Sequence, residues 1–303
     1  MPWEVPLPRS PVSPAGQPDG RDLPQRRRVL ITGGSSGIGA ATAAEFAARG
    51  FLVAVTGRDA AALDRVAGAA GGVSIPGDLR EPGSGRRVVD AAAVALGGLD
   101  VVVSNAGVGW AGPFTEMTAQ EIDELLDVNL RAPAHVAHAA LAHLPPGTGH
   151  LVMVGSIAGL LGVAGETWYS ATKAGVGMLA DTLRAELRAE AIGLSLVVPG
   201  VVDTPYFDRR KVPYRRSSPR PIAAEVVAAA IADAVEQRRD VVIVPEWLGW
   251  PARLKGAFPA LYRRLERSLD SEGRNGGKGG RWHGGKRAPV VGTAGPWPRN
   301  AGA

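Results

Sequence analysis

Short apolar runs alternate with longer, alanine-rich stretches along most of the chain. The runs are rich in Val, Leu and Ile and are bounded by glycine or charged residues, which is typical of strands buried on both faces of a parallel sheet. The predicted strands are residues 29–31, 51–56, 73–75, 99–104, 151–154, 193–198 and 240–244. The predicted helices are residues 40–49, 60–70, 83–96, 117–144, 169 to about 191, and 223–237. This alternation predicts an α/β fold, a single doubly wound parallel sheet with helices on both faces.

Four residues mark expected helix ends and breaks. Gly50 can close the helix at 40–49 in a left-handed conformation. Thr118 and Glu121 have the spacing of a capping box and predict the start of the helix at 117–144. Pro133 lies inside that helical pattern, so we expect it to kink or divide the helix.

The first strand leads into a glycine-rich turn at residues 32–39. Glycine lets the backbone approach a phosphate closely, and the N–H groups at the start of the next helix point at the anion. The spacing Gly33-x3-Gly37-x-Gly39 differs from the G-x-G-x-x-G fingerprint of dinucleotide-binding folds. The turn therefore indicates a phosphate cradle, with a merely flexible turn as the alternative.

The end of the second strand bears on the choice of cofactor. A carboxylate there would bind the ribose hydroxyls of NAD(H), but this chain has Gly57. Arg58 follows, and a guanidinium grips a 2′-phosphate with two hydrogen bonds. The sequence thus favours NADP(H) over NAD(H). Asp59 keeps the alternative open, because a shift of two residues would place its carboxylate on the ribose.

Composition narrows the chemistry further. The chain has 303 residues and no cysteine, which excludes disulfides, thiolate catalysis and zinc–sulfur sites. The formal net charge of +5 equals the basic excess of residues 271–303 alone, so the charge is weak support for nucleic-acid binding. Histidines cluster in one stretch, but no carboxylate follows them at a useful spacing, and we expect no metal site. They are His135, His138, His143 and His150.

Candidate catalytic residues follow the fifth strand. Ser156 lies in its exit loop, and Tyr169 and Lys173 lie one turn apart at the start of the next helix. A free tyrosine has a pKa near ~10, and a neighbouring ammonium stabilises the phenolate and lowers that value. The pair is therefore predicted to act as a general acid or base on a hydroxyl or carbonyl oxygen that Ser156 also binds. A simple surface contact is the alternative, which the phosphate cradle disfavours.

Together these motifs closely resemble those of the short-chain dehydrogenase/reductase family, in order and spacing, over about residues 28–245. The matching motifs are Thr32-Gly-Gly-Ser-Ser-Gly-Ile-Gly39, Asp78-Leu79, Asn105-Ala-Gly107, Asn129, Ser156, Tyr169-x3-Lys173 and Pro199-Gly200. The resemblance implies a Rossmann-type sheet of about seven strands in the order 3-2-1-4-5-6-7. One departure is Ser104, where the family more often has a second asparagine, and we expect activity to survive it.

The resemblance also implies residue roles. Asp78 binds the adenine amino group, and Thr204 binds the nicotinamide carboxamide. Lys173 also holds the nicotinamide ribose, and Asn129 passes protons to it through a water. The expected catalytic residues are Asn129, Ser156, Tyr169 and Lys173. The expected cofactor-binding residues are Gly33, Ser35, Ser36, Gly37, Ile38, Gly39, Arg58, Asp78, Leu79, Asn105, Ala106, Gly107, Tyr169, Lys173, Pro199, Gly200, Val202 and Thr204.

The chain is expected to hold one catalytic domain at residues 25–270. The proline-rich leader at 1–24 and the Gly/Arg-rich tail at 271–303 lack apolar periodicity and are predicted to be disordered. Residues 252–269 have leucines at helical spacing and a basic opposite face, which predicts an amphipathic helix divided by Pro259. Packing on the protein or a partner subunit is favoured for this helix, with an anionic membrane surface as the alternative.

Residues 205–221 form the segment that covers the substrate in the resembled family. The segment has six basic residues against Asp208 alone, so we expect a solvated, mobile lid. An anionic or carrier-linked substrate is the alternative interpretation of the same charges.

The predicted function is an NADP(H)-dependent oxidoreductase that interconverts a carbonyl and an alcohol by hydride transfer, with Tyr169 as proton donor or acceptor. Alternatives are an epimerase or other non-net-redox enzyme that uses bound cofactor, and a cofactor-binding regulatory protein without turnover. We expect a small-molecule substrate, no nucleic-acid partner, and a homodimer or homotetramer. A cytoplasmic location is expected, because the leader lacks the charge and apolar order of a secretory signal.

Overall fold

The structure is a computed structural model that describes residues 26–210 and 219–264. It divides into two compact units, Met1–Arg253 and Leu254–Ala303, which are described separately here. The predictions for residues 1–24 and 271–303, and for the middle of 205–221, fall outside the described residues and stay predictions.

The first unit is built on a parallel sheet of seven strands in the order β3-β2-β1-β4-β5-β6-β9. This confirms the predicted order, since β9 is the seventh strand of the sheet. Two further strands, β7 and β8, pair with each other in a separate parallel ribbon. The strands are β1 (Arg28–Thr32), β2 (Leu52–Gly57), β3 (Val73–Pro76), β4 (Val101–Ser104), β5 (His150–Val154), β6 (Gly193–Pro199), β7 (Val202–Asp203), β8 (Ile222–Ala223) and β9 (Val241–Val244).

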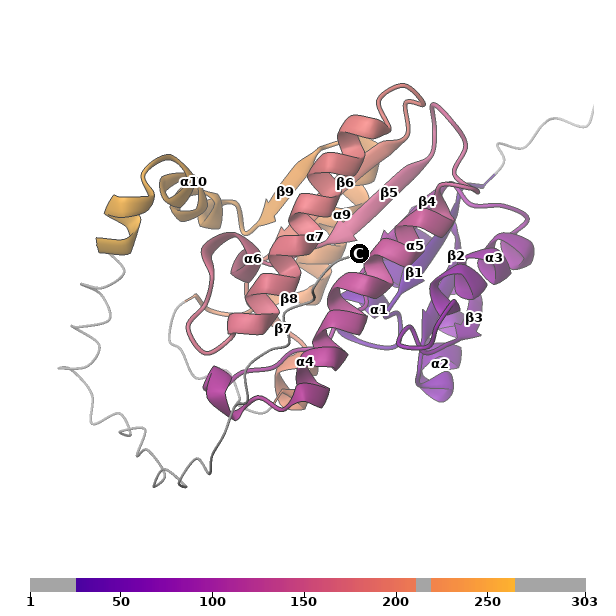
Figure 1. Ribbon diagram of the computed structural model, residues 1–303. Helices are drawn as coiled ribbons and strands as arrows, with labels where there is room; N and C mark the ends of the chain where they lie inside the picture. The colour runs from indigo at the N-terminus through magenta and orange to yellow at the C-terminus, as the bar shows by residue number, and fades with distance from the viewer. Residues whose placement is uncertain (1–25, 211–218, 265–303) are drawn as a thin grey trace, which may run out of the picture. The chain divides into compact units, whose positions relative to one another are not determined.

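Helices cover both faces of the sheet, as predicted (Figure 1). One face carries α1 (Gly37–Ala48), α2 (Ala60–Ala70) and α9 (Ala224–Glu236). The other carries α3 (Ser84–Leu96), α5 (Ala132–Ala140) and α7 (Thr167–Glu186). Shorter helices are η1 (Phe114–Glu116), α4 (Ala119–Leu126), α6 (Ile157–Leu161), α8 (Tyr206–Arg209) and η3 (Glu246–Leu248).

Side-chain alternation along each strand feeds these two layers. In β1, Val29 and Ile31 pack toward Phe46 of α1, while Leu30 faces the opposite core with Val136 of α5. All five side chains are almost fully excluded from solvent. A strand buried on both faces needs apolar residues at every position, which explains the continuous apolar runs in the sequence.

The predicted helix at 117–144 is divided, as Pro133 indicated, but the break has a particular form. Thr118 and Glu121 form the predicted capping box at the start of α4. A π-helical segment, η2 (Asp127–Arg131), then leads into α5. Proline has no N–H to donate to the carbonyl four residues earlier, so the regular α-helical hydrogen-bond ladder cannot pass Pro133.

The helix after the glycine-rich turn begins earlier than predicted. α1 starts at Gly37 rather than at residue 40, so its first N–H groups belong to the turn itself. The end of the helix is as expected, because Gly50 has a left-handed φ of 84° and donates to the carbonyl of Ala47. The early start places the helix N-terminus within the glycine-rich turn.

The last helix, α10 (Gly249–Ala257), spans the boundary between the two units. Helical backbone stops at Phe258 and resumes from Pro259 to Arg264, so the predicted division at Pro259 is present. Phe258 and Leu261 are exposed, and the packing of this segment stays a prediction. Within the described residues, no helix has the length and apolar content to cross a bilayer.

Candidate active site

A cavity of about 490 Å³ opens at the carboxyl edge of the sheet, where the loops after β1, β2, β3, β4, β5 and β6 converge. Open α/β sheets bind ligands at this edge. All but two of the predicted site residues line the cavity, and the exceptions, Gly39 and Asn129, support it from behind. The lining residues from the predicted set are Gly33, Ser35, Ser36, Gly37, Ile38, Arg58, Asp78, Leu79, Asn105, Ala106, Gly107, Ser156, Tyr169, Lys173, Pro199, Gly200, Val202 and Thr204.

The glycine-rich turn needs its glycines for steric reasons. Gly33 has a φ of 67°, and a Cβ there would lie 2.8 Å from the Cα of Ala106. A Cβ on Gly39 would collide with the carbonyl oxygen of Gly33. A Cβ on Gly37, which has a φ of 55°, would lie 3.0 Å from Thr204. The turn is therefore packed tightly between the exits of β4 and β6, with the start of α1 facing the cavity.

Hydrogen bonds join the exits of β1 and β4. The hydroxyl of Thr32 accepts from the backbone N–H groups of Asn105, at 2.9 Å, and Ala106, at 3.0 Å. The side-chain amide of Asn105 donates to the carbonyl of Thr32 at 2.9 Å. The Asn105–Gly107 segment is thus fixed beside the glycine-rich turn.

One end of the cavity is rich in charged side chains. Arg58 is exposed and lines the cavity beside Ser35 and Gly57. Asp59, which the sequence left as a ribose-binding alternative, instead caps α2 by accepting from the N–H of Ala62 at 2.9 Å. The capping contact holds the Asp59 carboxylate at the helix start, and Asp59 does not line the cavity, whereas Arg58 does.

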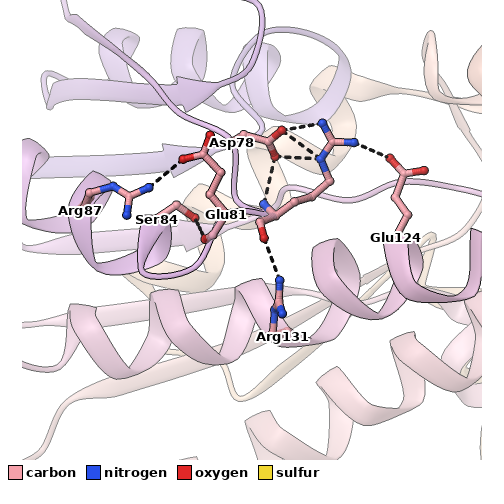
Figure 2. Close-up of polar contacts among 7 residues, drawn as sticks. Asp78, Glu81, Ser84, Arg87, Glu124 and Arg131 are labelled. Atoms are coloured by element: carbon pink, nitrogen blue, oxygen red, sulfur yellow. Dashed lines mark hydrogen bonds and ion pairs between the residues drawn. The ribbon is translucent and has the colours of Figure 1, made fainter. Parts of the chain in front are cut away.

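Asp78 belongs to a network of ion pairs at the same end. Arg80 forms ion pairs with both Asp78 and Glu124, and Figure 2 shows these two carboxylates on opposite sides of its guanidinium. Arg80 Nη2 lies 2.6 Å from Asp78 Oδ2, and Arg80 Nη1 lies 3.2 Å from Glu124 Oε1. Arg131 donates to the carbonyl of Arg80 at 2.7 Å. Hydrogen bonding to Arg80 holds the pKa of Asp78 below its usual range, and the charge of Arg58 adds to the effect.

The other end of the cavity holds the predicted catalytic side chains. Ser156 is the N-cap of α6 and accepts from the N–H of Ala158 at 3.2 Å. Tyr169, in the first turn of α7, is buried, and the hydroxyls of Tyr206 and Ser156 lie close enough to affect its pKa. Burial raises the pKa of Tyr169, and the two neighbouring hydroxyls reduce that rise without cancelling it. The expected lowering of this pKa by Lys173 is therefore not found, because removing the phenol from water is the larger effect.

Lys173 is also buried, and its Nζ donates to the carbonyl of Val154 at 3.0 Å. Burial lowers the pKa of Lys173 from 10.5 to about 8. Gly107 lies close by, since a Cβ there would be 3.5 Å from Lys173 Nζ and 3.3 Å from Asn129 Oδ1. The ammonium thus lies between the exits of β4 and β5.

Asn129 lies in the π-helical segment and is fully buried. Its side-chain oxygen accepts from the N–H of Val108 at 2.8 Å, and its amide nitrogen donates to the carbonyl of Val108 at 2.9 Å. Thr172 also lies 3.4 Å from that nitrogen. The amide therefore holds the loop after β4, a positioning contact that the sequence did not predict.

Among the cavity residues that were not predicted, three bring polar or charged side chains to the catalytic end: Glu166, Tyr206 and Arg210. Tyr206 is the first residue of α8, Arg210 directly follows α8, and Glu166 immediately precedes α7. Arg210 Nη1 lies 2.6 Å from Glu166 Oε1, and both side chains are largely buried. The position of Glu166, three residues before Tyr169, was a usable signal. Nothing in the local sequence linked Tyr206 to Tyr169, because their contact joins distant segments.

These features fit a bound dinucleotide. The glycine turn and the α1 N-terminus would face the phosphates. Arg58 and Asp78 lie toward one end, and Ser156, Tyr169 and Lys173 toward the other, of one continuous cavity. No group of three or more metal-ligating side chains occurs in the described parts of the chain.

Comparison with known proteins gives the family. A model of the short chain dehydrogenase family matches residues 27–213. This chain belongs to that family. Among its curated relatives, "Probable oxidoreductase EphD" of Mycobacterium tuberculosis is 33% identical over 242 residues, covering 72% of this chain. The chain spans only 41% of the length of that relative.

Solved structures of other members have the same fold. A short-chain dehydrogenase from Burkholderia cenocepacia J2315, in complex with NADP, is 33% identical with a TM-score of 0.66 over 72% of this chain and 96% of that one. A family member from Burkholderia phymatum, in complex with NAD, is 26% identical with a TM-score of 0.70 over 78% of this chain and 95% of that one. Both cofactors thus occur among similar structures.

Proposed function

We propose that this chain is an NADP(H)-dependent oxidoreductase that interconverts a carbonyl compound and its alcohol. The observation that carries the proposal is the layout of one cavity. A glycine-rich turn and an exposed arginine lie toward one end, and the buried Tyr169 phenol, the Ser156 hydroxyl and a buried ammonium lie toward the other. This layout suits a dinucleotide whose nicotinamide lies beside an acid–base group.

The preference for NADP(H) rests on Arg58. Its guanidinium lines the cavity where β2 ends. Gly57 has no side chain to bind the ribose, and the Asp59 carboxylate is engaged in capping α2. The positive charge of Arg58 also lowers the pKa of Asp78, so the two side chains lie near one another. A 2′-phosphate would pair with Arg58, while Asp78 would accept from the adenine amino group.

The bound dinucleotide would supply the hydride, which adds to the carbonyl carbon of the substrate. The residues Ser156 and Tyr169 would hold the carbonyl oxygen with their hydroxyls. Tyr169 would then give its proton to that oxygen as the alcohol forms, and the reverse reaction would return the proton to the phenolate. Such acid–base help contributes typically ~10²–10⁴-fold to the rate.

Lys173 would stabilise the phenolate and bind the nicotinamide ribose. Its pKa of about 8 keeps it mostly charged at neutral pH while leaving proton exchange accessible. Asn129 would keep the loop after β4 in place, as its two hydrogen bonds to Val108 already do. The family-derived proton relay through Asn129 remains a proposal.

The substrate end of the cavity suits an uncharged, largely apolar carbonyl compound. Arg210 lines this end of the cavity, and its charge is already balanced by Glu166 at 2.6 Å. An anionic substrate would have to break that ion pair. The apolar residues that line the cavity near these side chains are Val108, Leu161, Val163, Phe207 and Leu248.

A panel of aldehydes and ketones, assayed by loss of NADPH absorbance, tests the proposal. We expect at least one apolar ketone to be reduced faster with NADPH than with NADH, and Tyr169→Phe to remove that activity. Turnover of a sugar or amino-acid stereoisomer without net change in NADPH would instead indicate the epimerase alternative. Tight NADPH binding with no turnover across the panel would indicate a regulatory protein.

A further inference from the structure

The short helix α8 brings a second phenol to the catalytic end of the cavity. Tyr206, its first residue, has its ring centroid 6.0 Å from that of Tyr169, and its hydroxyl lies close enough to the Tyr169 oxygen to affect the pKa of both phenols. The ring also packs directly on Gly109, where a Cβ would collide with the phenolic carbon and oxygen. The loop after β4 and the start of α7 therefore confine the Tyr206 hydroxyl from two sides.

A buried ion pair fixes α8 in this position. Arg210, just after the helix, pairs with Glu166, just before α7, at 2.6 Å. The guanidinium also stacks on Phe207 at 4.6 Å, and Phe207 packs edge-on against Tyr206 at 5.3 Å. Because Arg210 and Glu166 are both largely buried, this contact is screened less by solvent than a surface pair. The position of the Tyr206 hydroxyl is thus defined by packing and not by the hydroxyl contact alone.

We propose that Tyr206 is a positioning residue for the proposed reaction, whose hydroxyl donates a hydrogen bond to the Tyr169 oxygen and stabilises the phenolate that proton transfer leaves there. This inference rests on the proposed role of Tyr169 as the acid–base group. A phenolate has more than one acceptor site, so Tyr206 and Ser156 can both donate to it.

The charges around the two phenols agree with this direction of donation. The contact lowers the pKa of Tyr169 and raises the pKa of Tyr206, as expected when Tyr206 donates. Glu166 raises the pKa of Tyr169 and Arg210 lowers it, so the two members of the ion pair have opposite effects that partly cancel. Among the described residues, Lys173 of α7 is another charged group that lines this end of the cavity.

Phenol titration tests the contact without any cofactor or substrate. The chain has four tyrosines, so a Tyr214→Phe/Tyr262→Phe background leaves only Tyr169 and Tyr206. In that background, Tyr206→Phe removes one oxygen and keeps the ring. A hydrogen bond to a charged group contributes ~1.5–3 kcal/mol, so the ionisation midpoint of Tyr169, followed by phenolate absorbance, should rise by about one pH unit or more over its value in the unaltered background.

Two further variants separate the hydroxyl from general packing. Gly109→Ala, at a position without a positive φ, should push the Tyr206 ring away from Tyr169 and raise the same midpoint. Leu248→Ala removes an apolar side chain from the cavity lining, in a core cluster separate from that of Tyr206, and should leave the midpoint where it was. An unchanged midpoint in Tyr206→Phe, or an equal shift in Leu248→Ala, would overturn the proposal.

The pH profile of alcohol oxidation with NADP⁺ gives the functional test. Oxidation needs the phenolate, so Tyr206→Phe should lower kcat about tenfold near neutral pH and recover toward the wild-type rate at high pH. A loss that is equal at every pH would show a merely structural role and would contradict the proposal. Full activity in Tyr169→Phe would instead remove the proposed function, while the phenol titration would still decide whether the hydrogen bond exists.

Discussion

The two ends of the cavity use charged and polar groups in opposite ways. At the Arg58 end, Asp78, Arg80 and Glu124 form ion pairs whose side chains are 24–42% exposed. At the Tyr169 end, Tyr169 and Lys173 are buried and Tyr206 is partly buried, and burial is the largest single cause of each pKa shift. Water therefore screens the first network more than the second.

This difference predicts where substitutions will be costly. Exposed ion pairs contribute little to stability, so the Arg58 end should tolerate change while still selecting the cofactor. Buried polar groups interact strongly and are difficult to replace. Substitutions at the Tyr169 end should therefore have the larger effects on turnover and on the free energy of unfolding.

The largest expected effect is the loss of turnover in Tyr169→Phe. The change removes the hydroxyl and keeps the ring that packs beside Tyr206. Turnover in single-turnover assays should fall by ~10²–10⁴-fold, the usual contribution of general acid–base catalysis. NADPH affinity should stay nearly unchanged. Tyr262→Phe, outside the cavity lining, is the matched control, and retention of more than about a tenth of turnover would contradict the assignment.

The next effect concerns stability and comes from Lys173. Its pKa is about 8 in the folded chain and near 10.5 unfolded, so between these values the unfolded state binds more protons and stability rises with pH. Below pH 8 the full cost of burying the ammonium is present. Lys173→Met should therefore raise the free energy of unfolding at pH 7 by about 1–3 kcal/mol, after loss of the hydrogen bond to Val154.

Denaturant unfolding at several pH values measures this directly. The wild-type curve should gain stability between pH 8 and 10.5, and the Lys173→Met curve should be flat by comparison over that window. The variant should also lose turnover and bind NADPH more weakly. If the two proteins have the same free energy of unfolding at every pH, burial of the Lys173 ammonium does not destabilise the fold, and the prediction is wrong.

The sequence predicted the scaffold of the site better than its electrostatics. Glycine spacing and strand ends placed Gly33, Gly37 and Asn105 correctly around the cavity, because those positions depend on local backbone geometry and on the parallel order of strands. The direction of the Tyr169 pKa shift was missed, since burial depends on residues far away in the chain. Tyr206 was missed for the same reason, and its contact with Tyr169 needs the fold of α8 against α7.

Some local contacts were not predicted from the sequence. Asp59 was considered only as a possible ribose ligand, and the structure shows that its carboxylate caps α2. A break in the helix at Pro133 was predicted. The sequence did not predict that the break would be π-helical, or that it would bury Asn129 against Val108. A proline removes one hydrogen bond, and the surrounding packing decides how the helix adapts.

An effect of similar size, on cofactor binding and not on stability, is expected from Arg58. Arg58→Ala removes one charge-assisted phosphate contact, so the preference for NADPH over NADH should shrink by about 1.5–3 kcal/mol. Fluorescence titration with both cofactors measures it. Arg65→Ala removes the same charge from an exposed position of α2 outside the cavity lining and should leave the preference unchanged. Equal affinity for the two cofactors in the unaltered protein would contradict the proposed selectivity.

The smallest effect is expected for stability at the Arg58 end of the cavity. Arg80→Ala breaks the ion pairs with both Asp78 and Glu124, yet these side chains are partly exposed, so the free energy of unfolding should change by less than about 1 kcal/mol at pH 7. Because Arg80 holds the pKa of Asp78 down, its stabilising effect is present above the unfolded pKa of Asp78 and is lost as the pH falls through the folded value. High salt should remove most of the difference from wild type. Arg87→Ala, which breaks the more exposed pair with Glu81, is the matched control. A salt-resistant loss of more than about 2 kcal/mol in Arg80→Ala alone would mean that this end, too, depends on desolvated charge, and the contrast between the two ends would not hold.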